Sequence, residues 1–140
     1  NESSNWRSDA DFSNAIDIAV PYEIYILIKG QGVKRYFAGG DNSLTLQNFK
    51  NFNQQDYNLL SNATCLDVSD KSLVLGDPTS KRVLLFKIDD TDQKNLTFTK
   101  QFVYRGDSNV FKEIKEITIS EEGTGTIYVL DGTRVIRIDL

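Results

Sequence analysis

The chain has 140 residues, of which 39% are hydrophobic and 26% charged, and a formal net charge of −4. This length predicts one domain with a hydrophobic core, and the acidic balance disfavours nucleic acid and anionic lipid as partners. No apolar run approaches the roughly 20 residues that cross a bilayer, so we expect no direct membrane contact. The sequence begins with Asn1 and has no methionine, and we expect it to be a processed or excised region.

A strand pattern recurs three times along the chain, at Ile16–Val20, Thr64–Val68 and Lys115–Ile119. Each copy keeps large apolar residues at its last two odd positions, which is the period-2 alternation of a strand. Counted between their last residues, the copies are 48 and 51 residues apart. An all-strand repeat of about 40–50 residues is typical of a β-propeller blade.

Each copy is followed by two further apolar runs with a turn between them. The turn residues are typical of hairpins, because glycine supplies positive φ and Asp and Pro favour chain reversal. The predicted hairpin turns are Gly30–Gly32, Asp77–Ser80 and Asp131–Thr133. After the second copy, a polar link leads into a fourth run, Leu96–Tyr104, whose counterpart in the first copy is Leu44–Phe52.

We therefore predict an all-β fold of three antiparallel four-stranded propeller-like blades, a partial or half propeller, in a single domain over residues 1–140. The blades cover about 14–53, 62–105 and 114–140, and residues 3–12 form the outer strand of a preceding blade. Known propellers have about four to eight blades, so three cannot close a ring. The exposed end faces predict missing blades from a parent chain or a homo-dimer, with a self-sufficient open stack as the alternative.

The third strands, Arg82–Phe86 and Arg134–Ile138, and the run Ile127–Asp131 resemble six-bladed propeller repeats of the NHL type. The pattern is also similar to the carboxy-terminal propeller-like region of uncharacterised bacterial membrane-anchored proteins, some of which carry a PPM-type phosphatase-like domain. That second resemblance implies a sensor or docking domain outside the cytoplasm. No Trp-Asp pair ends a blade and no Gly-His pair opens one, which disfavours the WD-repeat family.

Histidine is absent from the chain, which excludes Ser-His-Asp and Cys-His catalysis and the common zinc sites. The densest acidic cluster, Asp89, Asp90 and Asp92, lacks the glycine and distal glutamate of an EF-hand loop, and we interpret it as a solvated link. We therefore predict no catalytic, metal or cofactor site. The single cysteine, Cys65, is predicted to pack as a small hydrophobe between blades rather than to act as a reactive thiol.

The binding residues that the repeat suggests are two Arg/Asp pairs, Arg7 with Asp9 and Arg105 with Asp107. They recur at the same place in the repeat and are predicted to share one rim, on loops that connect an outer strand to the next inner strand. Loops carried on a rigid scaffold commonly bind partners. The alternative is an Arg–Asp pair that only fixes this crossing loop.

The residues that follow the first strand of each copy, Tyr22, Asp70 and Glu121, occupy equivalent positions and are predicted to line the opposite rim.

Two hypotheses for function stand. The first is a non-catalytic binding, scaffold or sensor module of a larger protein that presents a protein or glycan surface on the propeller rim. The second is a fragment of a propeller enzyme, a hydrolase or lyase, with carboxylates clustered around a central cavity. The absence of histidine favours the first.

Overall fold

The computed structural model describes residues 11–36, 43–45, 48–50, 62–89, 95–106, 109–122 and 125–140. Within these ranges all the regular structure is β-strand. The strands are β1 (Ala15–Ala19), β2 (Ile24–Ile28), β3 (Gly32–Tyr36), β4 (Ser43–Thr45), β5 (Asn48–Lys50), β6 (Cys65–Val68), β7 (Ser72–Asp77), β8 (Arg82–Ile88), β9 (Asn95–Val103), β10 (Ile114–Ser120), β11 (Thr126–Asp131) and β12 (Arg134–Asp139). In the described part of the chain there is no helix long and apolar enough to span a membrane.

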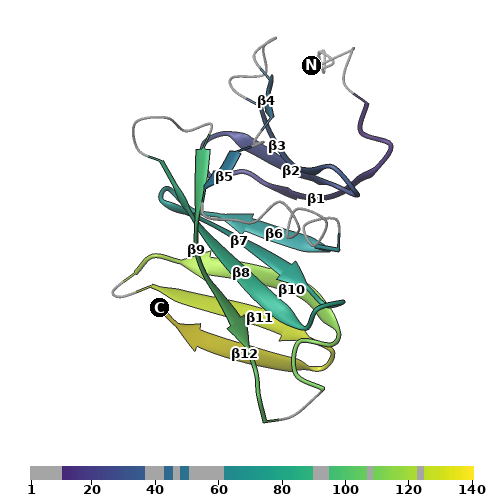
Figure 1. Ribbon diagram of the computed structural model, residues 1–140, viewed down its shortest axis with the longest axis vertical. Coiled ribbons are helices and arrows are strands. Elements are labelled where there is room, and N and C mark those ends of the chain that lie inside the picture. Colours follow the sequence, from purple (N-terminus) through teal and green to yellow (C-terminus); the bar gives the residue numbers. More distant parts are fainter. Residues whose placement is uncertain are drawn as a thin grey trace, which may run out of the picture.

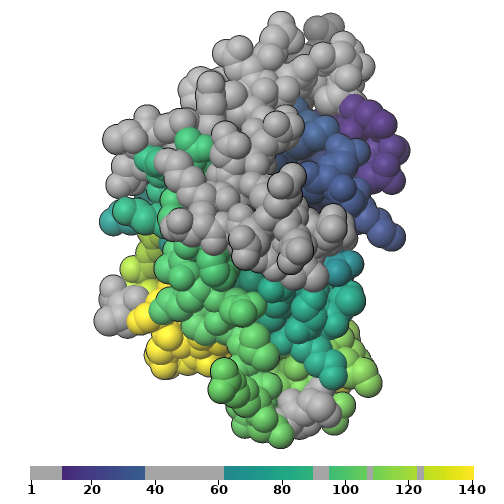
Figure 2. All heavy atoms as spheres, in the orientation of Figure 1, coloured from purple at the N-terminus to yellow at the C-terminus, as the bar shows by residue number. Residues whose placement is uncertain are grey.

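The strands form three sheets that follow one another along the long axis of the molecule (Figure 1). The first sheet has the order β1-β2-β3-β4, the second β5-β9-β8-β7-β6 and the third β10-β11-β12. All pairings are antiparallel except β5 with β9, which is parallel. In the space-filling view the same progression runs from the purple N-terminal part to the yellow C-terminal part (Figure 2). The predicted all-β, propeller-like architecture is therefore confirmed.

The three predicted hairpins are all present, joining β2 to β3, β7 to β8 and β11 to β12. Gly30 and Gly32 have φ values of 73° and 87°, and Gly132 has a φ of 64°. These left-handed conformations are available to glycine without steric cost. Turn residues at these three places thus set where each sheet reverses.

The first strand differs from the repeat pattern by one position. The pattern aligns Val20 with Val68 and Ile119. In the structure, however, Ala19 takes the place in β1 that Val68 takes in β6, and Ala19 is buried. Ile18 and Val20 are 59% and 60% exposed. A shift of one residue turns each side chain to the other face of the sheet, so Ile18 and Val20 lie on the face opposite to Ala19.

The run predicted as the outermost strand of the first copy is divided between two sheets. β4 pairs with β3, whereas β5 pairs with the start of β9 in the second sheet. β9 itself is the fourth strand that the sequence predicts in the second copy, paired along β8. The third sheet has three strands among its described residues. The strand predicted at 3–12 lies almost entirely outside the described residues.

Two apolar clusters hold the sheets face to face. The first joins the first and second sheets, and its largest fully buried side chains are Leu27, Leu73, Leu75, Leu84 and Phe86. The second joins the second and third sheets, and includes Cys65, Val74, Val83, Ile127 and Val129. Both faces of the second sheet are therefore buried, and the sheets stack as successive blades of a propeller do.

One glycine shows how close this packing is. A Cβ atom on Gly76, in β7, would lie 2.6 Å from Cys65 Sγ and 2.8 Å from Ile114 Cγ2. No real Cβ contact is that short, so a larger residue forces the second and third sheets apart.

We therefore predict that Gly76→Ala lowers the free energy of unfolding by about 1–3 kcal/mol, the usual cost of overpacking a core. Chemical denaturation measures it. Lys115→Ala, at an exposed position of β10, is the control and is expected to change stability by less than about 0.5 kcal/mol. Equal stability of the wild type and Gly76→Ala would contradict the contact between these two sheets.

Candidate binding site on the loop rim

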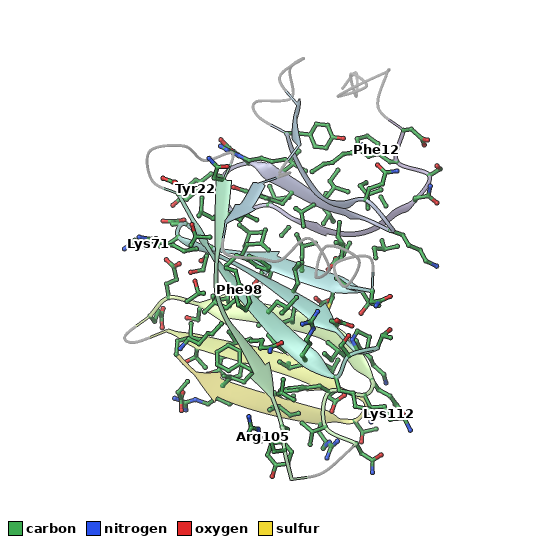
Figure 3. The ribbon with its side chains drawn as sticks, in the orientation of Figure 1. Phe12, Tyr22, Lys71, Phe98, Arg105 and Lys112 are labelled. Atoms are coloured by element: carbon green, nitrogen blue, oxygen red, sulfur yellow. The ribbon has the colours of Figure 1, made fainter. Side chains whose placement is uncertain are left out.

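The loops that connect the first two strands of each sheet lie on one side of the molecule. Their described residues are 20–23, 69–71, 121, 122 and 125, and we call them the loop rim. Figure 3 shows Tyr22 and Lys71 together on this side, away from Lys112. The three residues that the repeat places in equivalent positions, Tyr22, Asp70 and Glu121, are all exposed.

Hydrogen bonds join the loop of the third sheet to that of the second. Glu121 Oε1 accepts from the Ser69 hydroxyl and, at 3.2 Å, from the Lys71 backbone N–H. The Ser69 hydroxyl oxygen in turn accepts the Ser72 N–H, at 3.2 Å. The equivalent loops are therefore fixed relative to one another, which a binding surface made from several loops requires.

The loops of the first and second sheets enclose a small cavity of about 90 Å³. Tyr22, Glu23, Ser69 and Asp70 contribute to its wall. The Tyr22 side chain is 82% exposed, so the cavity opens beside a large aromatic ring. The rim thus offers an aromatic surface next to hydroxyl and carboxylate groups.

A buried ion pair restrains Glu23, one of the residues that line this cavity. The Arg35 guanidinium pairs with the Glu23 carboxylate and lies 6.0 Å from the centre of the Tyr25 ring. Burial lowers the pKa of Arg35 and raises the pKa of Tyr25. The ion pair with Arg35 therefore restrains the Glu23 side chain.

Each sheet has one edge strand that we call its inner strand: β1, β6 and β10. Carboxylate side chains also lie on these inner strands. Asp17 accepts the Ile18 N–H through one oxygen at 2.8 Å and the Leu66 N–H of the next sheet through the other at 2.7 Å. Asp67 accepts the Val68 and Ile119 N–H groups in the same way, each at 2.8 Å.

We call this arrangement the carboxylate clasp. In both cases the carboxylate joins its own strand to the inner strand of the following sheet. Asp67 also accepts the Thr118 hydroxyl at 2.8 Å. The acceptor oxygens of both groups are thus used by protein donors, which is a structural role and not that of an acid or base awaiting a substrate.

The clasp predicts a stability effect. Asp67→Asn replaces one acceptor oxygen by an NH₂ donor that faces N–H and O–H donors, so we expect the free energy of unfolding to fall by about 1–3 kcal/mol. The matched control is Asp139→Asn, because Asp139 only forms an exposed pair with Arg137, and such pairs contribute about 0–1 kcal/mol. Urea denaturation of both variants makes the comparison, and a larger loss in Asp139→Asn would contradict the clasp.

Of the four residues predicted from the Arg/Asp repeat, the structure describes one. Arg105 is exposed just beyond β9, on the part of the molecule where Lys112 also lies (Figure 3). Arg7, Asp9 and Asp107 lie outside the described residues. The proposed pairing of these residues on one rim therefore stays a prediction.

A different Arg and Asp fix the crossing loop between the second and third sheets. Buried Asp131 accepts the Phe111 and Glu113 N–H groups, both at 2.8 Å. Arg134 donates to the Asn109 carbonyl oxygen at 2.9 Å and pairs with Asp131 at 3.3 Å. In the sequence, Asp131 stands in an Asp-Gly turn, and that turn predicts only the hairpin. Its aspartate also organises a loop about 20 residues upstream.

Cys65 is buried between the second and third sheets, as predicted. Burial, followed by the nearby charges of Glu116 and Asp17, raises the pKa of its thiol to about 12. Thiolate is the reactive form, so the folded protein holds this sulfur unreactive. Among the described residues no group of three or more His, Cys, Asp or Glu side chains is arranged to hold a metal ion.

This raised pKa predicts a pH dependence. Above the ordinary thiol pKa of 9.0 the unfolded chain loses the Cys65 proton and the folded chain keeps it until about pH 12, so the thiol favours unfolding as the pH rises through this window. We expect wild-type stability to fall by about 1 kcal/mol more than that of Cys65→Ala between pH 8 and pH 10. Parallel denaturation curves at the two pH values test this, and identical pH dependence of both proteins would refute it.

Comparison with known proteins places the fold. No family model and no curated protein matches the chain. Among solved structures, the hemopexin-fold protein CP4 from cow pea superposes with a TM-score of 0.54 and 13% sequence identity over 90% of this chain. This chain spans 62% of the length of that protein. The hemopexin fold is a four-blade propeller-like fold, and at this identity the likeness establishes the propeller-like fold alone.

Proposed function

We propose that this domain is a non-catalytic binding or scaffold module that recognises its partner through the loop rim. The observation that carries the proposal is the 82% exposed Tyr22 ring, beside Asp70 on a neighbouring loop that is itself tied to Glu121. Tyrosine is enriched among the residues that dominate binding energy at interfaces. The Tyr22 ring lies beside loops that are fixed by hydrogen bonds, and no described side chain covers it.

The partner class that this rim fits is a protein or a glycan. Asp70, Glu121 and Glu122 are exposed on the rim beside a single exposed lysine, Lys71, so its net negative charge attracts a partner with lysine or arginine side chains. A flat aromatic ring beside hydroxyl and carboxylate groups also suits stacking and hydrogen bonding to a sugar. A protein partner is the first choice because the acidic groups outnumber the aromatic one.

The alternative, a fragment of a propeller hydrolase or lyase, needs carboxylates that face a substrate. The inner-strand residues Asp17 and Asp67 are the best placed, and both are engaged in the carboxylate clasp. The buried Asp77 likewise accepts the Ser80 N–H and pairs with Arg82. These bonds support binding over catalysis.

We further propose that the three sheets are blades of a partial propeller of the NHL-like kind and that each blade has four strands. The three copies of the strand pattern and the stacked sheets support it. A sensor or docking domain outside the cytoplasm, as in the bacterial membrane-anchored proteins that the sequence resembles, is consistent with a binding rim. Recognition would extend to the opposite rim through two Arg/Asp pairs, Arg105 with Asp107 and Arg7 with Asp9.

The test compares two exposed tyrosines at different ends of the molecule. Labelled wild type, Tyr22→Ala and Tyr104→Ala are applied to an array of lysine- and arginine-rich peptides and to an array of oligosaccharides. We expect ligands of the wild type to lose roughly tenfold or more affinity for Tyr22→Ala and to keep their affinity for Tyr104→Ala, whose ring lies beyond β9 and is 58% exposed.

Melting temperatures of all three proteins should agree, because both side chains are exposed. Equal losses in the two variants, or conversion of an oligosaccharide into products by the wild type, would refute a binding role for the rim.

A further inference from the structure

Two faces of the stack have no described sheet against them, one at each end. On the outer face of the first sheet, Ile16 and Ile18 are 42% and 59% exposed and, with Phe12, Ile24 and Ile26, line a hollow of about 590 Å³. Ile26 is itself buried, in a cluster with Ile28 and Tyr36. The faces of the second and third sheets that correspond to it are also apolar and are buried against the preceding sheet. The outer face of the first sheet therefore corresponds to faces that pack against a preceding sheet elsewhere in the stack, but no described sheet covers it. We call it the receiving face.

The outer face of the third sheet has the opposite character. Glu116 lies across the β10–β11 ladder from Leu130, and Thr118 lies across from Tyr128, so these side chains share one face. Tyr128 and Leu130 are each 39% exposed. The buried partners Ile117 and Val129 point the other way, toward the second sheet.

Glu116 repeats half of the carboxylate clasp. Its Oε1 accepts the N–H of the following residue, Ile117, at 3.1 Å, as Asp17 and Asp67 do with Ile18 and Val68. In those two cases the second oxygen binds an N–H of the next sheet. Glu116 Oε2 accepts no hydrogen bond from the described residues, and it lies on the face where a next sheet would be.

We propose that a second copy of this chain docks head to tail, its first sheet on the third sheet of the first copy. The apolar face around Ile18 would cover Tyr128 and Leu130, and Glu116 would accept a backbone N–H of β1, which is an edge strand. The contact would continue the interface that the chain already makes twice internally. Two copies joined through both ends form a ring of six sheets.

The experiment measures mass by light scattering and sedimentation over a concentration series of the full 140-residue chain. Wild type should shift from monomer to dimer as concentration rises. Ile18→Asp disables the receiving face and Glu116→Lys the donating face, and each should raise the dissociation constant at least tenfold. Lys115→Ala, beside Glu116 on the same strand, should leave it unchanged.

Mixing the two variants distinguishes a head-to-tail contact from any other. Each variant keeps the face that the other lacks, so an equimolar mixture should associate more strongly than either variant alone. Matching circular dichroism and melting temperatures confirm that the variants are folded, as expected for exposed positions.

Two results would overturn the proposal. A chain that stays monomeric at every concentration would favour the four-blade arrangement of the hemopexin-fold neighbour, completed by one further sheet. A dimer that neither variant weakens, or a mixture with no recovery, would mean that another surface forms the contact.

Discussion

Each sheet of this protein presents an edge strand to the centre of the stack, and unpaired N–H groups on such an edge must find acceptors. Asp17 and Asp67 supply them, each bridging its own strand and the inner strand of the following sheet. A hydrogen bond to a carboxylate is roughly twice as strong as one between neutral groups. This bond, together with the apolar clusters between the sheets, sets how each sheet lies on the next.

The position of the loop rim follows from that stacking. Because successive sheets are held in equivalent positions, the loops after β1, β6 and β10 come to one side of the molecule, and Glu121 ties the loop after β10 to the loop after β6. Asp17 and Asp67, on the inner strands, are engaged in bonds that support the fold. The rim instead exposes Tyr22, Asp70 and Glu122, and this division is the physical basis for proposing binding rather than catalysis.

Much of the fold could be predicted because strands and turns have local signals. Alternating apolar residues located the strands, and the turn residues located the three hairpins. Cys65 was predicted to pack between blades because it faces away from Leu66 and Val68. The repeat alignment fails at the first strand: Ile18 and Val20 fit the pattern well, but Ala19 is the residue that packs against the second sheet. Which face of a strand is buried depends on its register and on the sheet packed against it, which the local pattern does not contain.

By itself the sequence determined the all-β class, the repeat and its turns and the absence of histidine chemistry, because these depend on residue type and spacing. Only the tertiary structure decided which acidic residues are engaged and which are exposed. Asp67, Asp131 and Glu121 look alike in the sequence, yet their partners are about 20 to 50 residues away. Contacts of that range are set by the register and stacking of whole sheets.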